Sequence, residues 1–307
     1  MKIAIMGSGG VGGYFGARLA QGGSDVTFIA RGAHLAALRG HGLRIESATG
    51  NLHLPRVQAT DEPASIGPVD LVLFAVKLFD TEAAARAIRP LVGPATGVIP
   101  FQNGVQAREL LQQELGEAPV MGGVAYIGAV IREPGVIAHT GTMHRLVFGE
   151  FNGRRSARAE AFLAACQRGG FDAELAGDIL LRIWQKFVLL VGVSGSTTSM
   201  RMPIGPIRAN PLTRAFLRDL IAETAAVGRA LGVALAPDEA ESRLAQLDGF
   251  PPEMTSSMHQ DLKRGHRLEL MWLSGAVVDL GRQAGVPTPA NRAVRDILAL
   301  HADGPAA

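Results

Sequence analysis

The first 115 residues alternate between short apolar runs and segments of helical composition. The apolar runs are bounded by glycine, proline or polar residues, which is typical of buried parallel strands. Predicted strands span residues 2–6, 25–30, 70–76 and 97–101, and predicted helices span 11–21, 81–91 and 105–115. This alternation predicts a mostly parallel sheet with helices on both faces, which is a Rossmann-like α/β domain.

The pattern changes from about residue 119. Short apolar runs separated by glycine and proline predict antiparallel strands that close the first domain, over residues 120–127, 135–139 and 145–149. A helix over 156–168 and a strand over 172–175 complete it. After Gly177 the pattern becomes helical, over 178–193, 211–231, 237–247, 253–264, 268–284 and 291–301. We therefore expect a dinucleotide-binding domain over 1–176 and an all-α domain over 177–307 for substrate binding and a possible homodimer contact.

Composition restricts the class of protein. Hydrophobic residues make up 47% and charged residues 19% of the chain, which is enough for a large core. A net charge of +2 gives no reason to expect nucleic acid or a membrane as partner. The single cysteine, Cys166, excludes an intrachain disulfide and is expected to be buried. No stretch approaches the ~18–20 apolar residues of a membrane span, and the N-terminal apolar run is too short for a signal peptide. We expect a cytoplasmic protein.

A glycine-rich motif follows the first predicted strand and opens the first helix. It has the form G-x-G-x-x-G and consists of Gly7, Ser8, Gly9, Gly10, Val11 and Gly12. Such a loop lets a pyrophosphate approach the backbone, and the helix N-terminus offers N–H groups to the phosphates. The position after a strand and before a helix favours a dinucleotide site. The alternative is a glycine-rich turn that binds nothing.

Polar residues also follow the other predicted strands. Arg31 follows the second strand, where NAD-dependent enzymes carry an acidic residue, so the sequence favours NADPH, whose 2′-phosphate an arginine can pair with. Lys77 and Asn103 follow later strands, at the carboxyl ends where such sheets bind ligands. Asn103 is a candidate N-cap, a candidate ligand contact, or both. Arg31 and Lys77 have the alternative of being solvated surface charges.

These residues and others resemble the ketopantoate reductase (2-dehydropantoate 2-reductase) family along nearly the whole chain. The matching segments are GSGGVGG with Arg31, AVK ending at Lys77, QNG containing Asn103, WQK ending at Lys186, SSMHQDLKRGHRLE from Ser256 to Glu269, and VPTP from Val286 to Pro289 with Asn291. The resemblance implies hydride transfer from NADPH to the ketone of a 2-keto acid, with ketopantoate reduced to pantoate in pantothenate biosynthesis.

The resemblance also implies roles for individual residues. It makes Lys186, Glu269 and Asn103 catalytic, with Asn103 and Glu269 also near the cofactor, and Ser257 a substrate contact. It assigns the NADPH 2′-phosphate to Arg31 and Lys77. No set of His, Cys and Asp residues has metal-ligand spacing, so no metal is expected.

The chemistry of Lys186 agrees with such a role. Hydride delivery leaves negative charge on the substrate oxygen, which needs a proton donor. Lys186 lies in the apolar segment IWQKFVLLVGV, where partial desolvation would lower its pKa. Taken singly, each residue has another interpretation: a snorkelling Lys186, an ordinary surface acid at Glu269, and a helix start at Ser256 and Ser257. His259 is expected on the surface.

Two positions depart from the family pattern. Asparagines are expected four and eight residues after the lysine, but the chain has Leu190 and Ser194. Both lie on the lysine's helix face and are candidate substrate contacts. Leu190 would suit a more apolar 2-keto acid, so a related D-2-hydroxy acid dehydrogenase is an alternative function. A non-catalytic nucleotide-binding sensor is the second alternative.

Overall fold

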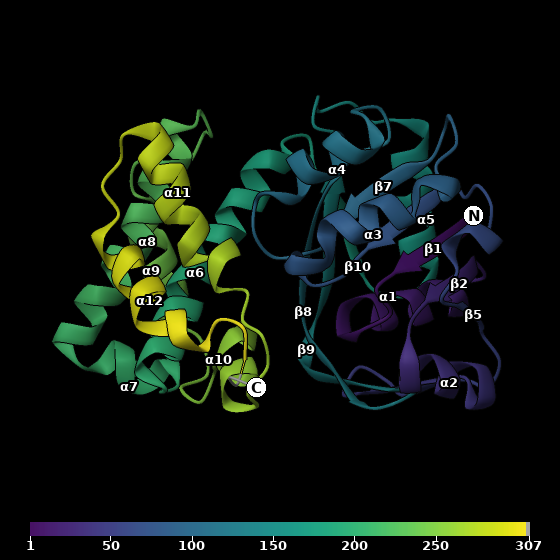
Figure 1. The fold of residues 1–307 in the computed structure, drawn as a ribbon, viewed down its shortest axis with the longest axis horizontal. Coiled ribbons are helices and arrows are strands. Elements are labelled where there is room, and N and C mark those ends of the chain that lie inside the picture. The colour runs from purple at the N-terminus through teal and green to yellow at the C-terminus, as the bar shows by residue number, and fades with distance from the viewer. Residues whose placement is uncertain (305–307) are drawn as a thin grey trace. The chain divides into compact units, whose positions relative to one another are not determined.

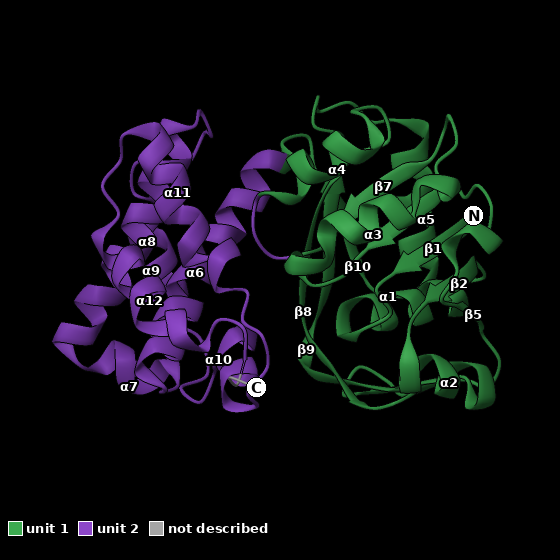
Figure 2. Ribbon diagram, in the orientation of Figure 1, with its two compact units in different colours: residues 1–102, 106–179 green, residues 103–105, 180–307 purple. Residues whose placement is uncertain are grey.

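The computed structural model describes residues 1–304 and divides into two compact units (Figure 2). The first contains residues 1–102 and 106–179, and the second contains residues 103–105 and those from 180 onward. The division therefore falls after Ile179, whereas the sequence pattern predicts it after Ala176. The short segment Asn103–Val105 belongs to the second unit although both of its neighbours in the chain belong to the first.

A parallel five-stranded sheet forms the centre of the first unit (Figure 1). Its order is β5-β2-β1-β6-β7, with β1 Lys2–Met6, β2 Asp25–Ile29, β5 Gln58–Thr60, β6 Leu71–Phe74 and β7 Gly97–Pro100. Ile3 and Ile5 point into one core cluster, and Ala4 and Met6 point into another. Because both faces are buried, these strands are continuous apolar runs. The expected α/β Rossmann-like class is confirmed.

Helices cover this sheet, and the helix that begins in the glycine-rich motif also contacts the second sheet of the unit. The helices are α1 Gly10–Gln21, α2 Gly32–His41, α3 Thr81–Ala87, α4 Ala107–Leu115 and α5 Ala157–Arg168, with short 3₁₀ turns at Pro63–Ser65, Leu78–Asp80 and Arg89–Leu91. α1 packs against strands of both sheets of the unit, which buries Tyr14 and Phe15 completely. Cys166 on α5 is buried, as expected. α2 was not predicted, because it is flanked by glycine and buries only Leu35 and Leu38.

The second sheet is mixed, where the sequence predicted antiparallel strands. It contains β10 Asp172–Leu175, β9 Val136–Gly149, β3 Leu43–Ser47 and β4 Leu52–Leu54 in that order, and β8 Gly122–Glu133 pairs with β9. The β8–β9 pair is antiparallel, but β9 runs parallel to β3 and to β10. The antiparallel prediction is confirmed for β8 and β9, but it is wrong in its division, because residues 135–139 and 145–149 belong to the single strand β9. The parallel pairs were not predicted, since β3 comes from an earlier part of the chain and its pairing depends on tertiary packing.

The second unit is helical, as predicted. It contains α6 Ile179–Met200, α7 Ile204–Ala209, α8 Pro211–Ala230, α9 Glu239–Asp248, α10 Ser257–Lys263, α11 Ser274–Ala284 and α12 Pro289–Leu298, with 3₁₀ turns at Leu270–Trp272 and Ala299–His301. α6 runs to Met200 instead of ending at Val193. The small polar residues near its end are accommodated in the helix, because the hydroxyls of Ser196 and Thr197 donate to the carbonyls four residues earlier, each at 2.7 Å.

Within the described chain, α6 is also long and apolar enough to cross a membrane by length and composition. This corrects the expectation that no segment approaches such a length. The most apolar part of α6 is 56% buried in the protein, and Val188, Val191 and Val193 belong to the core of the second unit. A core position accounts for the absence of charge from Phe187 to Met200.

Candidate active site

The glycine-rich loop joins β1 to α1, and its glycines have different surroundings. Gly7 has φ +94°, and a Cβ there would lie 2.7 Å from the backbone nitrogen of Val76. A Cβ on Gly12 would collide with the carbonyl oxygen of Gly7. Gly9, in contrast, has no heavy atom within 4 Å of the Cβ position. The loop therefore leaves open space beside Gly9, next to the first N–H groups of α1, which have no acceptor inside the helix.

Ser8 is buried, and its side chain is hydrogen-bonded to the backbone of the first unit. Its Oγ donates to the carbonyl of Ile29 at 3.0 Å, and its N–H donates to the same carbonyl at 3.3 Å. The side chain of Ser8 therefore ties the loop to β2, and it is the backbone around Gly9 that borders the open space.

Arg31 and Lys77 follow the two strands that flank β1. β2 and β6 both pair with β1 in parallel, so their carboxyl ends lie beside the glycine-rich loop. Both side chains are exposed. Arg31 is the N-cap residue of α2 and forms no ion pair with any described residue. The edge of this sheet therefore combines an open backbone loop with two cations, a donor set that suits a phosphorylated nucleotide.

A second group of predicted residues meets within the helical unit. Lys186 is half-buried on α6, and its Nζ donates to Oδ1 of Asn103 at 3.0 Å. Burial lowers the pKa of Lys186 to about 8, and the carboxylate of Glu269 acts against that shift. Lys186, Asn103 and Glu269 thus form one electrostatic cluster, in which an ammonium can give up a proton near neutral pH.

Asn103 does not cap α4. That helix begins at Ala107 with Gln106 as its N-cap, and the Asn103 amide is instead a partner of Lys186. The N-cap alternative is therefore wrong. Glu269 is only 4% exposed, which excludes the surface-acid alternative.

Ser256 and Ser257 have different environments. Ser256 is the N-cap of α10, and its Oγ accepts the N–H of His259 at 3.0 Å. Ser257 is the first residue of that helix and is exposed. Helix capping therefore accounts for the hydroxyl of Ser256, whereas the exposed hydroxyl of Ser257 is accessible to a ligand.

His259 was expected on the surface, and that expectation is wrong. The residue is half-buried, and its Nδ1 bonds to the carbonyl of Thr197 at 2.7 Å near the end of α6. The hydroxyls of Thr197 and Ser256 lie 3.1 Å apart. These bonds hold the start of α10 against α6. The sequence signal was weak, because nothing in it showed that α6 extends to Thr197.

Leu190 and Ser194 continue the α6 face of Lys186 at helical spacing. Leu190 is half-buried and packs against the second core. Ser194 is completely buried, and its Oγ has no hydrogen-bond partner within the described chain. Of the two, Leu190 is the side chain with exposed surface.

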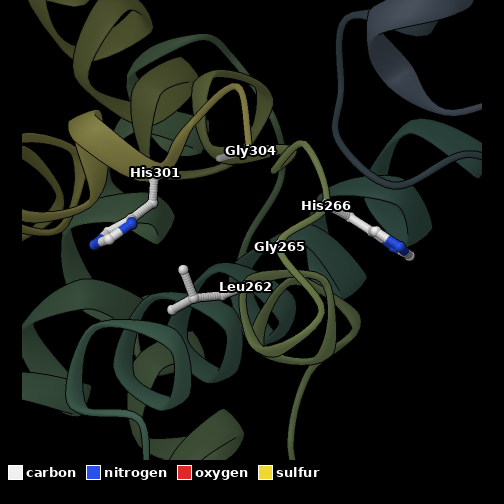
Figure 3. Close-up of a pocket in the computed structure, with 5 residues that line it drawn as sticks. All are labelled: Leu262, Gly265, His266, His301 and Gly304. Carbon is white, nitrogen blue, oxygen red and sulfur yellow. The ribbon is translucent and has the colours of Figure 1, made fainter. Parts of the chain in front are cut away.

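A separate hollow of about 190 Å³ lies elsewhere in the helical unit (Figure 3). It is lined by Leu262, Gly265, His266, His301 and Gly304. Figure 3 shows the ring of His266 directed away from Leu262 and His301. None of the predicted site residues lines this hollow. Over residues 1–304, no group of three or more His, Cys, Asp or Glu side chains is placed to hold a metal ion.

Comparisons with known proteins agree over both halves of the chain. The family described as "Ketopantoate reductase PanE/ApbA" matches residues 3–153, and its C-terminal counterpart matches residues 178–302. The 2-dehydropantoate 2-reductase of Mesorhizobium japonicum is 33% identical over 96% of this chain and 95% of its own. The "Uncharacterized oxidoreductase YkpB" of Bacillus subtilis is 32% identical over 94% and 95%.

A solved structure shows the same likeness in three dimensions. The 2-dehydropantoate 2-reductase of Geobacter metallireducens superposes with a TM-score of 0.90 at 32% identity, covering 97% of this chain and 99% of that one. The two-part match, the near-complete coverage and the clustered lysine, asparagine and glutamate lead to one conclusion: this chain belongs to the ketopantoate reductase family of nucleotide-dependent oxidoreductases.

Proposed function

We propose that the protein reduces a 2-keto acid to a 2-hydroxy acid with NADPH, and that ketopantoate, reduced to pantoate for pantothenate biosynthesis, is its substrate. The observation that carries the proposal is the Lys186 cluster. An ammonium with a pKa of about 8, held by Asn103 and accompanied by a buried glutamate, is suited to donate a proton. Relatives about one third identical over nearly their full length bear the name 2-dehydropantoate 2-reductase.

NADPH is the proposed cofactor because of the residues at the edge of the parallel sheet. The glycine-rich loop would hold the pyrophosphate, since the space beside Gly9 is open. Arg31 and Lys77 would hold the 2′-phosphate, and no acidic residue stands at position 31 to repel it. When bound, the cofactor supplies the hydride.

The residues of the helical unit would donate the proton and bind the carboxylate of the substrate. Lys186 donates a proton to the oxygen that becomes the hydroxyl, because hydride arrival makes that oxygen strongly basic. The Asn103 carboxamide accepts one ammonium hydrogen and so orients the remaining two. Glu269 keeps the ammonium charged, since it raises the pKa that burial lowers. Ser257 offers a hydroxyl to the substrate carboxylate.

Leu190 supports a second candidate, the reduction of 2-keto acids with aliphatic side chains. A half-buried leucine on the lysine's helix face gives a substrate hydroxyl no partner. A side chain without a hydroxyl would suit the same position at no cost.

The test is NADPH oxidation by the purified protein against a panel of 2-keto acids. The panel includes ketopantoate, its analogue without the hydroxyl, and pyruvates with straight and branched aliphatic chains. The proposal expects turnover with at least one of them and a clear preference for NADPH over NADH. Highest kcat/KM for ketopantoate supports the first substrate, and highest kcat/KM for an aliphatic acid supports the second. Nucleotide binding without turnover of any 2-keto acid would contradict the proposal.

A further inference from the structure

His34 connects three segments of the first unit that are far apart in the chain. It lies in the first turn of α2, three residues after Arg31. Its Nε2 is 2.9 Å from the carbonyl oxygen of Ser8 in the glycine-rich loop. Its Nδ1 accepts the N–H of Gly135, in the turn between β8 and β9, at 3.1 Å. Ser8 is itself bonded to the end of β2, so the ring stands at the junction of all these segments.

The two partners define the protonation state of the ring. A carbonyl oxygen only accepts, so Nε2 carries a hydrogen; a backbone N–H only donates, so Nδ1 carries none. The ring is therefore neutral. A proton added to Nδ1 would point at the N–H of Gly135 and break that bond. Gly135 cannot turn away easily, because its own carbonyl accepts the N–H of Arg44 at 2.9 Å.

The bond between His34 and the Ser8 carbonyl also fixes the orientation of the peptide group between Ser8 and Gly9. The peptide group between Ser8 and Gly9 is planar, and its C=O and N–H point in opposite directions. Holding the Ser8 carbonyl on His34 therefore directs the Gly9 N–H away from the ring. Gly9 is the loop residue with open space around it. A donor fixed in that direction is what a nucleotide phosphate needs.

We propose that His34 is a positioning residue of the nucleotide site, and that protonation of its ring weakens nucleotide binding. The inference rests on the proposed function in one respect, the binding of a nicotinamide nucleotide at this loop. Neutral His34 holds both the glycine-rich loop and the start of α2, which carries Arg31. Protonated His34 releases the β8–β9 turn and loosens that arrangement.

The surroundings favour the neutral ring. Burial lowers the pKa of His34, although the bond to Ser8 acts in the opposite direction. No charged side chain in the described part of the chain hydrogen-bonds to the ring. The ionisable residues on the elements that pack around it are Arg31, Arg39, His41, Arg44, Glu46, Asp61, Arg132 and Glu133. Arg39, Arg44 and Arg132 each pair with a carboxylate of this group, so none of these carboxylates is directed at the ring to favour its protonation.

Nucleotide binding as a function of pH tests the inference. The dissociation constants of NADPH and NADH are measured by nicotinamide fluorescence from pH 5 to 8, for the unmutated protein and for His34→Gln. Glutamine can donate to Ser8 but does not titrate. We expect the unmutated protein to bind NADH more weakly at pH 5.5 than at pH 7.5, by at most about tenfold because the pKa of the ring is lowered, and His34→Gln to lose that dependence. The NADH series is needed because the 2′-phosphate of NADPH titrates near pH 6 itself.

Two controls separate positioning from general stability. His53→Gln changes an exposed histidine on β4 and should leave the pH dependence of binding unchanged. In steady-state kinetics at pH 7.5, His34→Gln should change the KM for NADPH more than kcat, because the ring positions the loop proposed to bind the nucleotide. If His34→Gln does not fold, NMR titration of the His34 ring replaces it. The ring pKa should then fall when NADH binds, because linkage is reciprocal.

The outcomes are distinct. Loss of the pH dependence in His34→Gln, or a lower ring pKa in the complex, supports the inference. Superimposable pH curves for the two proteins, or an unchanged ring pKa, overturn it while the proposed function stands. Failure of the unmutated protein to bind either nucleotide overturns both.

Discussion

The ammonium of Lys186 donates to the side-chain oxygen of Asn103 at 3.0 Å, although the two residues are 83 positions apart in the chain. Asn103 follows the last strand of the parallel sheet but belongs to the helical unit, as do Gly104 and Val105. One short segment of the first half of the chain thus completes the polar environment of the lysine. The same asparagine does not cap the following helix, which begins at Ala107 with Gln106 as its N-cap.

Replacing Lys186 should remove proton donation. Lys186→Ala is expected to lower kcat by ~10²–10⁴, because general-acid assistance acts only in the transition state. The dissociation constant of NADPH should change little. Steady-state kinetics and a nucleotide titration check both parts. Lys263→Ala, at an exposed lysine on α10, is the matched control and should keep normal kcat. Near-normal turnover of Lys186→Ala would remove the lysine from the mechanism.

The lowered pKa of Lys186 predicts the pH dependence of reduction. The donor is the protonated form, so kcat should be constant below pH 8 and fall up to about tenfold per pH unit above it. Glu269 raises this pKa, and Glu269→Gln should therefore move the falling limb to lower pH. Pre-steady-state rates of hydride transfer from pH 6 to 10 measure this. A limb that stays in place or moves upward would show that Glu269 does not support the charge of Lys186.

Arg31 should determine the choice between the two nicotinamide nucleotides. Arg31→Ala is expected to weaken NADPH binding by roughly tenfold to a hundredfold, the worth of lost charge-assisted bonds of ~1.5–3 kcal/mol. NADH binding should be nearly unchanged. Arg39→Ala, on the same helix but paired with Asp61, serves as control. Equal affinity of the unmutated protein for both nucleotides would argue against the assignment.

Leu190 should influence which 2-keto acid is preferred. Leu190→Asn supplies a polar partner and is expected to shift the ratio of kcat/KM values toward ketopantoate by roughly tenfold to a hundredfold. The comparison uses ketopantoate and its analogue without the hydroxyl, in both proteins. Leu189→Asn, at the adjacent half-buried position on α6, is a control for polar substitution alone. An unmutated enzyme that already prefers ketopantoate by several orders of magnitude would show that another residue recognises the hydroxyl.

Short-range patterns were enough to predict most of the elements that position the proposed site. Met6 ends an apolar strand and Gly7 begins the glycine-rich motif, and both were found where the pattern placed them. Such features depend on neighbours within a few residues, so sequence alone specifies them. α2 and the strands β3 to β5 were missed because they are short and only partly buried, which leaves a weak periodic signal.

The sequence by itself determined the class of fold and the dinucleotide motif, and its resemblance to the ketopantoate reductase family implied the residues proposed for catalysis. Only the tertiary structure decided which of them meet. In the folded chain, Lys186 donates to Asn103, and Glu269 lies in the interior. His259 bonds to the backbone of α6, and the ring of His34 bonds to Ser8 and Gly135. The partners of His34 are 26 and 101 positions away in the chain. Contacts at such separations depend on how whole elements pack, and no local pattern of polar and apolar residues encodes them.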